Sequence, residues 1–375
     1  MRVAHLVDTL HPDGGEYGLE ALARAARTAE LELVVVGISG SGDGARAAAL
    51  RRAGAVVVEH GLAPWDPRAV PRIVETLREH RVRLVHTHAP NADVAGSAAT
   101  TRLRIPVVST LHRIEEEPAD RLHRLRRTAR TLARSRFVTR TIAISRLQRD
   151  WYLRVAGSEK GLVVLPDGVT DPGPADPAVR ARVRRSLGVG DDGLLALSAA
   201  PMRRGKGQDL LLDAVAELPE DLPLTVVLTG DGPLRPWLEA RVAREEELEG
   251  RVVFRHHGDP DPLLQAADLQ IHTTRTDSMP GVVVRGMAWG VPAVVSRVGG
   301  LPEIVTRDVG RQVPLSAAAI AGAIVELAGD DALRARLGRA ARARYLERFE
   351  AGGWAVRLRE VYDSALGSPV RSPGT

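Results

Sequence analysis

Short runs of apolar residues alternate with amphipathic segments along the whole chain. In the first half these runs have the length of strands that are buried on both faces of a sheet. The segments between them carry apolar residues at the spacing of one helix face. The predicted strands are residues 2–7, 31–36, 55–58, 84–86, 107–109, 141–144 and 163–165. This alternation predicts an α/β domain with a doubly wound parallel sheet.

The second half of the chain repeats the alternation. Its predicted strands are residues 194–197, 225–228, 252–254, 269–271 and 293–296. Between the halves, the run PDGVTDPGPADP is rich in proline and glycine, which is typical of an interdomain linker. We therefore predict two Rossmann-like parallel-sheet domains. The expected boundaries are 1–168 for the first domain, 169–190 for the linker, 191–345 for the second domain, 346–366 for a final helix and 367–375 for a disordered tail.

One stretch of the second half has the pattern of a strand, helix, strand crossover. The polar loop 276–281, TDSMPG, joins the predicted strand 269–271 to an apolar helix at 282–289, and the strand 293–296 follows. Open parallel sheets bind their ligands at the carboxyl ends of the strands, where helix N-termini also point. The loop is therefore a predicted ligand site.

Composition narrows the class of protein. The chain has 375 residues, 44% of them hydrophobic and 26% charged, as in globular proteins of two domains. It has no cysteine, which excludes disulfides and thiolate metal sites. We find neither an apolar run of about 20 residues nor the pattern of a signal peptide, so we expect a cytoplasmic location.

The net charge of +5 and the pI of about 10.1 raise the question of an anionic partner. Almost all of the positive charge is arginine, and aromatic residues, at 3%, are too few for nucleic-acid stacking. We therefore predict no nucleic-acid partner. Residues 121–140 are dense in arginine, with Leu122, Leu125 and Leu132 at helical spacing. This segment fits either a solvated helix face or weak peripheral contact with the inner face of a membrane.

Two loops between a predicted strand and helix are suited to phosphate binding. Gly14 and Gly15 allow backbone amides to approach an anion, although a plain tight turn has the same composition. Arg203, Arg204 and Lys206 combine cationic side chains with the free amides of a helix N-terminus, as a diphosphate requires. The latter loop lacks the spacing of a Walker loop.

Other chemistries have weaker signals. Gly40, Gly42 and Ala45, with Glu59 after the next strand, fit the dinucleotide-binding pattern of an oxidoreductase, but they follow the second predicted strand rather than the first. The Asp-x-Asp pattern at 259–261 is better explained as a helix start. We predict no metal site, and no Ser-His-Asp arrangement indicates a hydrolase.

A series of motifs covers nearly the whole chain. It comprises the early glycine pair, TLH at 110–112, AIS at 143–145, LPDGV at 165–169, GKG at 205–207, GDGP at 230–233 and MPGVVVRGMAWGVPAVVSRVGGLPEIV at 279–305. With these motifs the chain resembles the retaining glycosyltransferases of family four, which have the GT-B fold of two Rossmann-like domains facing across a cleft.

This resemblance implies an enzyme that transfers a hexosyl or N-acetylhexosaminyl group with retention of configuration. The donor is expected to be a nucleotide-diphosphate sugar of UDP or GDP type, bound mainly by the second domain with no obligatory cofactor or metal. The first domain is expected to face a small-molecule or lipid-linked acceptor, and the final helix to cross back onto the first domain.

The resemblance also implies roles for particular residues. The implied catalytic residues are His112, beside the transferred sugar, and Asp277, which contacts that sugar. The implied diphosphate-binding residues are Gly14, Gly15, Arg203, Arg204 and Lys206. The implied donor sugar and nucleotide contacts are Gly230, Met279, Gly281, Val282 and Arg285.

The chain departs from the family's pattern at three positions. Asp277 stands where the first of two signature glutamates is usual, and it is a shorter carboxylate. Arg285 stands at the second glutamate, and arginine cannot accept a hydrogen bond from a ribose hydroxyl. Pro201 replaces an arginine that usually precedes the lysine. A GT-B protein that binds a nucleotide or a partner without catalysis is therefore the alternative hypothesis.

Overall fold

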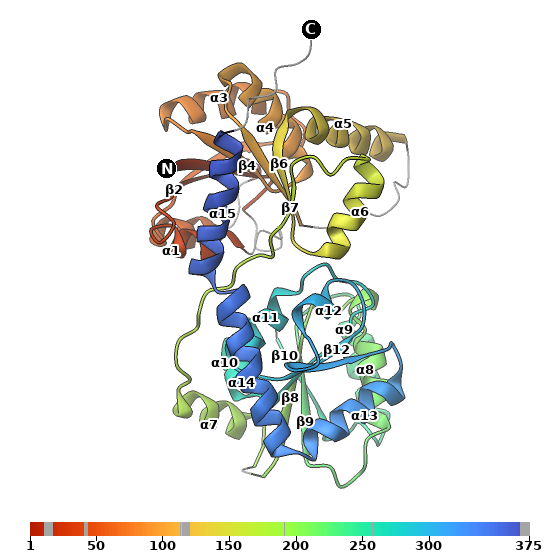
Figure 1. Ribbon diagram of the computed structural model, residues 1–375. Coiled ribbons are helices and arrows are strands. Elements are labelled where there is room, and N and C mark those ends of the chain that lie inside the picture. The colour runs from red at the N-terminus through yellow and green to blue at the C-terminus, as the bar shows by residue number, and fades with distance from the viewer. Residues whose placement is uncertain are drawn as a thin grey trace. The chain divides into compact units, whose positions relative to one another are not determined.

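The chain forms two compact units. The computed structural model describes residues 1–10, 18–40, 44–112, 114, 121–190, 192–256 and 258–367. Unit 1 combines Met1–Thr170 with Glu350–Thr375, and unit 2 is Asp171–Phe349. In Figure 1 the blue C-terminal helix α15 accordingly lies in the same unit as the red and orange N-terminal elements.

Unit 1 is built on a seven-stranded parallel sheet with the order β3-β2-β1-β4-β5-β6-β7. Its strands are β1 (Arg2–Val7), β2 (Glu32–Ser39), β3 (Val56–Leu62), β4 (Leu84–Thr87), β5 (Val107–Leu111), β6 (Val138–Ala143) and β7 (Leu162–Val164). The order of the strands reverses between β1 and β4, and such a switch point is where doubly wound sheets place their ligands.

Helices cover both faces of this sheet. They are α1 (Gly18–Ala25), α2 (Ala45–Arg52), α3 (Ala69–Glu79), α4 (Pro90–Leu103), α5 (Arg121–Phe137), α6 (Arg146–Ala156) and α15 (Ala351–Leu366). Because side chains alternate along a strand, Val3 and Val7 of β1 pack in the core beneath α1, α2 and α15. Ala4 and Leu6 pack on the opposite face, in the core beneath α3 and α4.

Unit 2 has a six-stranded parallel sheet with the order β10-β9-β8-β11-β12-β13. Its strands are β8 (Leu194–Ala199), β9 (Leu224–Thr229), β10 (Val252–Arg255), β11 (Leu269–His272), β12 (Ala293–Ser296) and β13 (Gly310–Val313). The edge strand β13 was not among the predicted strands, since its sequence GRQV has little apolar character. The neighbouring strands β8 and β11 end at the loops that carry the predicted donor contacts.

The helices of unit 2 also cover both sheet faces. They are α7 (Pro177–Ser186), the 3₁₀ helix η2 (Arg204–Lys206), α8 (Gln208–Ala216), α9 (Arg235–Val242), α10 (Asp261–Ala266), α11 (Gly281–Ala288), α12 (Leu301–Ile304), α13 (Ala317–Ala328) and α14 (Asp331–Arg348). One core lies beneath α8, α13 and α14. The other lies beneath α7, α10 and α11. The prediction of an α/β fold with two parallel sheets is confirmed.

The expected linker at 169–190 is wrong in its extent. Its central part, Pro177–Ser186, is helix α7, which belongs to unit 2 and begins where the side chain of Asp176 accepts a hydrogen bond from the amide of Ala178. Arg184 of this helix is 9% exposed and pairs with Asp268 at 2.8 Å. The proline-rich composition of the segment concealed a packed helix with an aspartate cap.

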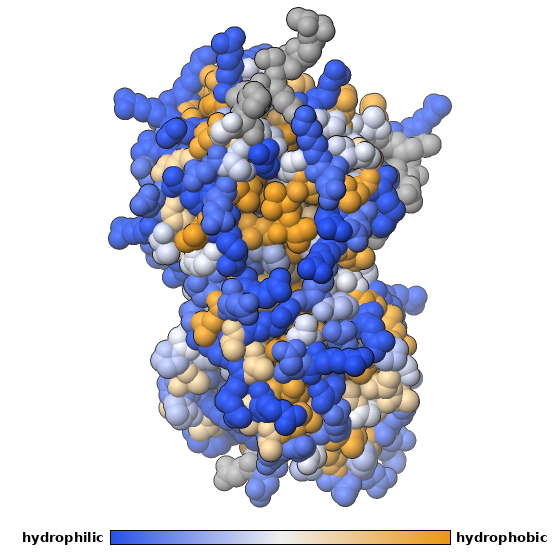
Figure 2. All heavy atoms as spheres, viewed as in Figure 1, coloured by the Kyte–Doolittle hydropathy of each residue, from blue (hydrophilic) through white to orange (hydrophobic). Residues whose placement is uncertain are grey.

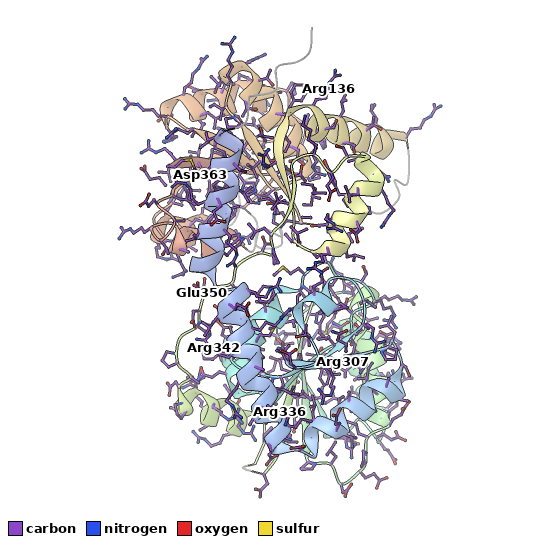
Figure 3. All side chains as sticks on the ribbon, in the orientation of Figure 1. Arg136, Arg307, Arg336, Arg342, Glu350 and Asp363 are labelled. Carbon is purple, nitrogen blue, oxygen red and sulfur yellow. The ribbon has the colours of Figure 1, made fainter. Side chains whose placement is uncertain are left out.

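The C-terminal boundaries also differ from the expected ones. The single helix expected at 346–366 is divided, since α14 continues to Arg348 and α15 begins at Ala351. Glu350 produces the division because its carboxylate accepts hydrogen bonds from the amides at the start of α15. Figure 3 labels this glutamate at the junction of the two helices. Of the tail expected at 367–375, only residue 367 lies within the described residues.

Figure 2 shows hydrophilic side chains over most of the visible face of each unit, with hydrophobic patches between them. Of the arginines labelled in Figure 3, Arg136, Arg307 and Arg336 are exposed, whereas Arg342 pairs with Asp171 at 2.8 Å. Within the described residues, no helix has the length and apolar character needed to cross a membrane.

Candidate active site

Two predicted site residues meet at the carboxyl edge of the sheet in unit 2. Lys206 lies in η2, after β8, and Asp277 lies in the loop after β11. The Lys206 ammonium donates a hydrogen bond to Asp277 Oδ2 at 2.5 Å, and the two side chains are 26% and 16% exposed. A partly buried ion pair therefore stands at the place where parallel sheets bind ligands.

The carboxylate of Asp277 is kept charged by its neighbours. Burial raises its pKa, but the interaction with His272 and the charge of Lys206 outweigh burial, so the pKa lies below its ordinary value. His272 Nε2 is 3.5 Å from Asp277 Oδ2, the same oxygen that Lys206 contacts. Both of these contacts use Oδ2 and neither uses Oδ1.

Two glycines hold these loops in place. Gly299 has φ +60°, and a Cβ there would lie 1.9 Å from the carbonyl oxygen of Asp277. The next amide, that of residue 300, donates to the same carbonyl at 3.0 Å. Gly230 has φ +137°, and a Cβ there would lie 2.1 Å from the carbonyl oxygen of Ala200. Both positions require glycine, because any side chain would displace the loop beside the ion pair.

The other predicted donor contacts in unit 2 are accessible. Arg203 and Arg204 are exposed in the loop that ends at Lys206. Gly281 is the first residue of α11 and is also exposed, and Val282 and Met279 are partly buried beside it. The first amides of a helix have no partner within the helix, so this end of α11 offers donors to an oxygen-rich ligand.

Arg285, a predicted donor contact, pairs with two aspartates of unit 2. Its guanidinium donates to Asp261 at 2.9 Å and to Asp259 at 2.7 Å, and Trp289 Nε1 donates to the same Asp261 at 3.2 Å. Burial lowers the pKa of Arg285, but the two carboxylates raise it by more. One guanidinium faces two carboxylates, so the cluster has an excess of negative charge. The cation at this position is therefore neutralised locally.

In unit 1, the predicted catalytic residue His112 follows β5. Its Nδ1 is 3.6 Å from Asp167 Oδ2, and its side chain is 14% exposed. Its Nε2 is 2.9 Å from Nδ1 of His88, which lies just after β4. Both ring nitrogens of this predicted catalytic residue thus face groups of unit 1. The predicted phosphate contacts Gly14 and Gly15 lie outside the described residues.

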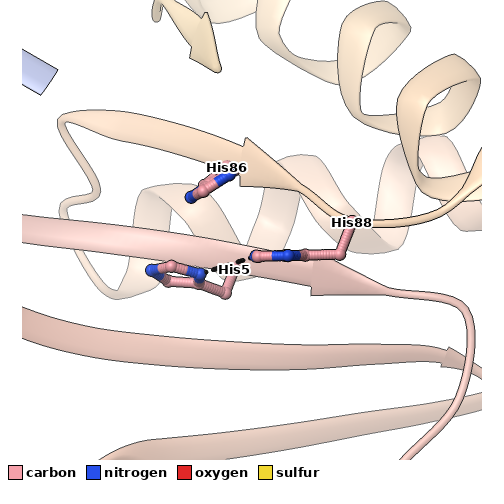
Figure 4. Close-up of side chains that lie close together, drawn as sticks. All are labelled: His5, His86 and His88. Atoms are coloured by element: carbon pink, nitrogen blue, oxygen red, sulfur yellow. Dashed lines mark hydrogen bonds between the residues drawn. The ribbon is translucent and has the colours of Figure 1, made fainter. Parts of the chain in front are cut away.

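Sequence reasoning missed the histidines behind His112. His5 on β1 is paired in register with His86 on β4, and His88 lies one residue beyond that strand (Figure 4). His5 and His86 are 0% and 1% exposed. Burial lowers the pKa of His5 to about 3 and lowers those of His86 and His88 well below 6.5. The available signal was the presence of histidines within the apolar runs RVAHLV and LVHTH.

The fold and these loops define a GT-B glycosyltransferase. Residues 193–330 match the family model described as glycosyl transferases group 1, and residues 12–171 match that described as glycosyltransferase family 4. The chain is 30% identical to a D-inositol 3-phosphate glycosyltransferase of Xylanimonas cellulosilytica, over 75% of this chain and 72% of that protein. The chain belongs to glycosyltransferase family four.

Two further proteins show the range of the similarity. The GDP-mannose-dependent alpha-(1-6)-phosphatidylinositol monomannoside mannosyltransferase of Mycolicibacterium smegmatis is 30% identical over 58% of this chain and 60% of that protein. The crystal structure of Anabaena HepE in complex with UDP has a TM-score of 0.84 at 24% identity, and it covers 97% of this chain and 100% of its own. The resemblance seen in the motifs and the GT-B fold class are confirmed.

Proposed function

We propose that this chain transfers a hexosyl or N-acetylhexosaminyl group from a UDP- or GDP-type sugar to a small-molecule or lipid-linked acceptor. We further propose that the reaction retains the configuration of the sugar and requires no metal ion. The ion pair of Lys206 and Asp277 carries the proposal. The names of the relatives, which include a GDP-mannose-dependent enzyme and a UDP complex, support a donor of this class.

Lys206 is proposed to stabilise the leaving group, which is the nucleoside diphosphate. As the bond between the sugar C1 and the phosphate oxygen breaks, negative charge develops on the nucleoside diphosphate. A lysine ammonium has three N–H donors, and Asp277 takes one of them, so two remain for the diphosphate. Arg203 and Arg204 supply further positive charge from the same loop. A fixed cation at a developing charge is worth about 3 kcal/mol of transition-state stabilisation.

Asp277 is proposed to bind the transferred sugar. Oδ1 accepts a hydrogen bond from a sugar hydroxyl, while Lys206 and His272 hold Oδ2. The amides of Gly281 and Val282 donate to other sugar oxygens. The acceptor oxygen attacks C1 on the face that the phosphate leaves, and its proton passes to the departing phosphate oxygen. Unit 1 is proposed to bind the acceptor, with His112 beside the transferred sugar.

The test measures nucleoside diphosphate release from a panel of UDP- and GDP-sugars, in EDTA and with added divalent cations. Lys206→Ala is expected to lower kcat by about 100-fold. Lys160→Ala is the matched control, because Lys160 is the other lysine of the chain and is exposed in unit 1. NMR of the product's anomeric proton tests retention. Release that requires a divalent cation, or an inverted product, would contradict the corresponding part of the proposal.

A lipid-linked acceptor is supported by helix α5. Leu125 and Leu132, seven positions apart on this arginine-rich helix, are 66% and 51% exposed. A basic helix with exposed leucines suits the surface of an anionic membrane. We expect the protein to float with anionic vesicles and not with neutral ones, and Leu125→Asp to weaken flotation. Equal flotation with both vesicle types would argue against this surface.

The second candidate function is nucleotide binding without catalysis. Pro201 and the neutralised Arg285 favour it, since the family's usual charges are absent from both positions. Calorimetry with UDP and GDP distinguishes the two functions. Nucleotide binding with no release from any donor would favour this second candidate over the transferase.

A further inference from the structure

Hydrogen bonds join the buried histidines of unit 1 to His112 in one continuous chain. Nitrogen to nitrogen, His112 is 2.9 Å from His88, and His88 is 2.8 Å from His5. Beyond His5, the hydroxyl of Tyr362 on α15 lies 3.5 Å from His5 Nε2 and 2.7 Å from His86 Nδ1. Figure 4 shows the central part of this chain, with the bond between His5 and His88 dashed.

The series of hydrogen bonds ends at a different polar side chain on each side. At the buried end, His86 Nε2 is 2.7 Å from the hydroxyl of Thr110. At the other end, His112 Nδ1 faces the carboxylate of Asp167. Between the two ends, each ring uses both of its nitrogens within the chain. The adjacent cavity has a volume of about 10 Å³ and is lined by all four histidines of the series, His5, His86, His88 and His112.

Because these imidazoles are neutral, all the hydrogen bonds between them must run in the same direction from donor to acceptor. Burial keeps His5, His86 and His88 uncharged at neutral pH, because it lowers the pKa of each. A neutral ring has one N–H donor and one bare nitrogen acceptor. If one ring of the chain donates through Nδ1, its neighbours must do the same. A single choice of proton position at one end therefore determines the tautomer of every ring.

The carboxylate of Asp167 determines which ring nitrogen of His112 carries the proton. An ionised carboxylate only accepts hydrogen bonds, so it favours the proton of His112 on Nδ1, which faces it at 3.6 Å. Nε2 of His112 is then bare and accepts from Nδ1–H of His88, whose Nε2 accepts from Nδ1–H of His5. The opposite direction would place a bare Nδ1 against the carboxylate, and two acceptors repel each other.

We propose that His88, His5, His86 and Tyr362 are positioning residues that hold His112 in one ring orientation, with its proton on Nδ1. The assignment of a catalytic role to His112 rests on the proposed function, whereas the tautomer is a property of unit 1 alone. The part of unit 1 contributed by α15 takes part directly, since the hydroxyl of Tyr362 bridges two of the rings.

A metal ion is a weaker explanation of the same cluster. The candidate ligand nitrogens of His5, His86 and His88 lie within 4.8 Å of one another. Zinc bound at about 2.0 Å would bring tetrahedral ligand atoms to about 3.4 Å. A metal would also displace hydrogen bonds of 2.7 to 2.9 Å that already satisfy these rings. The hydrogen-bonded chain needs no such rearrangement.

The experiment reads the tautomer directly. Long-range ¹⁵N–¹H correlation spectra of the full-length protein distinguish protonated from bare ring nitrogens. We expect the His112 proton on Nδ1 in the wild type and a mixture with the Nε2–H form in His88→Phe. His88→Gln should restore the Nδ1–H form, because its amide supplies both a donor and an acceptor. Tyr362→Phe, which removes a more distant link, should shift the mixture less than His88→Phe.

Kinetics provide the second measurement. His88→Phe should lower kcat by about 10- to 100-fold and leave the donor KM within about twofold, with most of kcat restored in His88→Gln. A wild-type His112 with its proton on Nε2, or a tautomer unchanged in His88→Phe, would overturn the proposal. Stoichiometric cobalt(II) binding lost in His88→Phe would overturn it in favour of a metal site. If the wild type were inactive but His112 had the expected tautomer, the result would count against the proposed function. The positioning of His112 by the other histidines would still be supported.

Discussion

Acidification from about pH 7 to about pH 5 should destabilise unit 1 through its buried histidines. Burial lowers the pKa of His5 from 6.5 to about 3, and it lowers the pKa values of His86 and His88 well below 6.5. Below about pH 6.5 the unfolded chain takes up protons on these rings and the folded unit does not. The stability of unit 1 is therefore highest above that pH and falls as the pH decreases toward about 3.

The magnitude follows from the shift of His5. At about pH 5, which is about 1.5 units below the unfolded pKa, this ring alone lowers the free energy of unfolding by about 2 kcal/mol. The slope contributed by one such ring is about 1.4 kcal/mol per pH unit. His86 and His88 change the stability in the same direction, because burial lowers their pKa values as well.

Hydrogen exchange of peptides from β1 and β4 measures this loss within unit 1, once the intrinsic exchange rates have been corrected for pH. The variant His5→Asn should reduce the dependence on pH by about 1.4 kcal/mol per unit, even if it is less stable throughout. An equal slope in the wild type and in His5→Asn would refute the reasoning.

Three further predictions concern single contacts. Arg285→Ala should leave calorimetric UDP or GDP affinity within about twofold, because its guanidinium is held by two aspartates; a larger loss would make it a donor contact. Gly299→Ala should lower both kcat and the melting temperature, since its Cβ would collide with Asp277; an unchanged kcat would contradict this. Arg134→Ala should lower the free energy of unfolding by about 3 to 5 kcal/mol in urea titrations, because it leaves the buried carboxylate of Asp93 without its counter-ion; a loss under about 1 kcal/mol would contradict this.

The periodic pattern of apolar residues was sufficient to predict the fold class and most strands. The central strands of each sheet are buried, so their sequences are mostly apolar runs, and loops with glycine or proline separate them. The pattern failed where the signal was weak, as at β13, or misleading, as at α7. Near Asp176 and Pro177 the composition suggested a linker, but the same two residues begin a helix.

The tertiary structure alone decided the partners of the charged and titratable side chains. Lys206 and Asp277 are 71 residues apart, and His5 and His88 are 83 apart, yet each pair is in hydrogen-bond contact. Neighbouring strands of a parallel sheet come from distant parts of the sequence, and nothing in local periodicity records which strands become neighbours. Motifs located the loops of the site. Only the order of the strands brought the carboxylate of Asp277 to Lys206 and joined three histidines to His112 through hydrogen bonds.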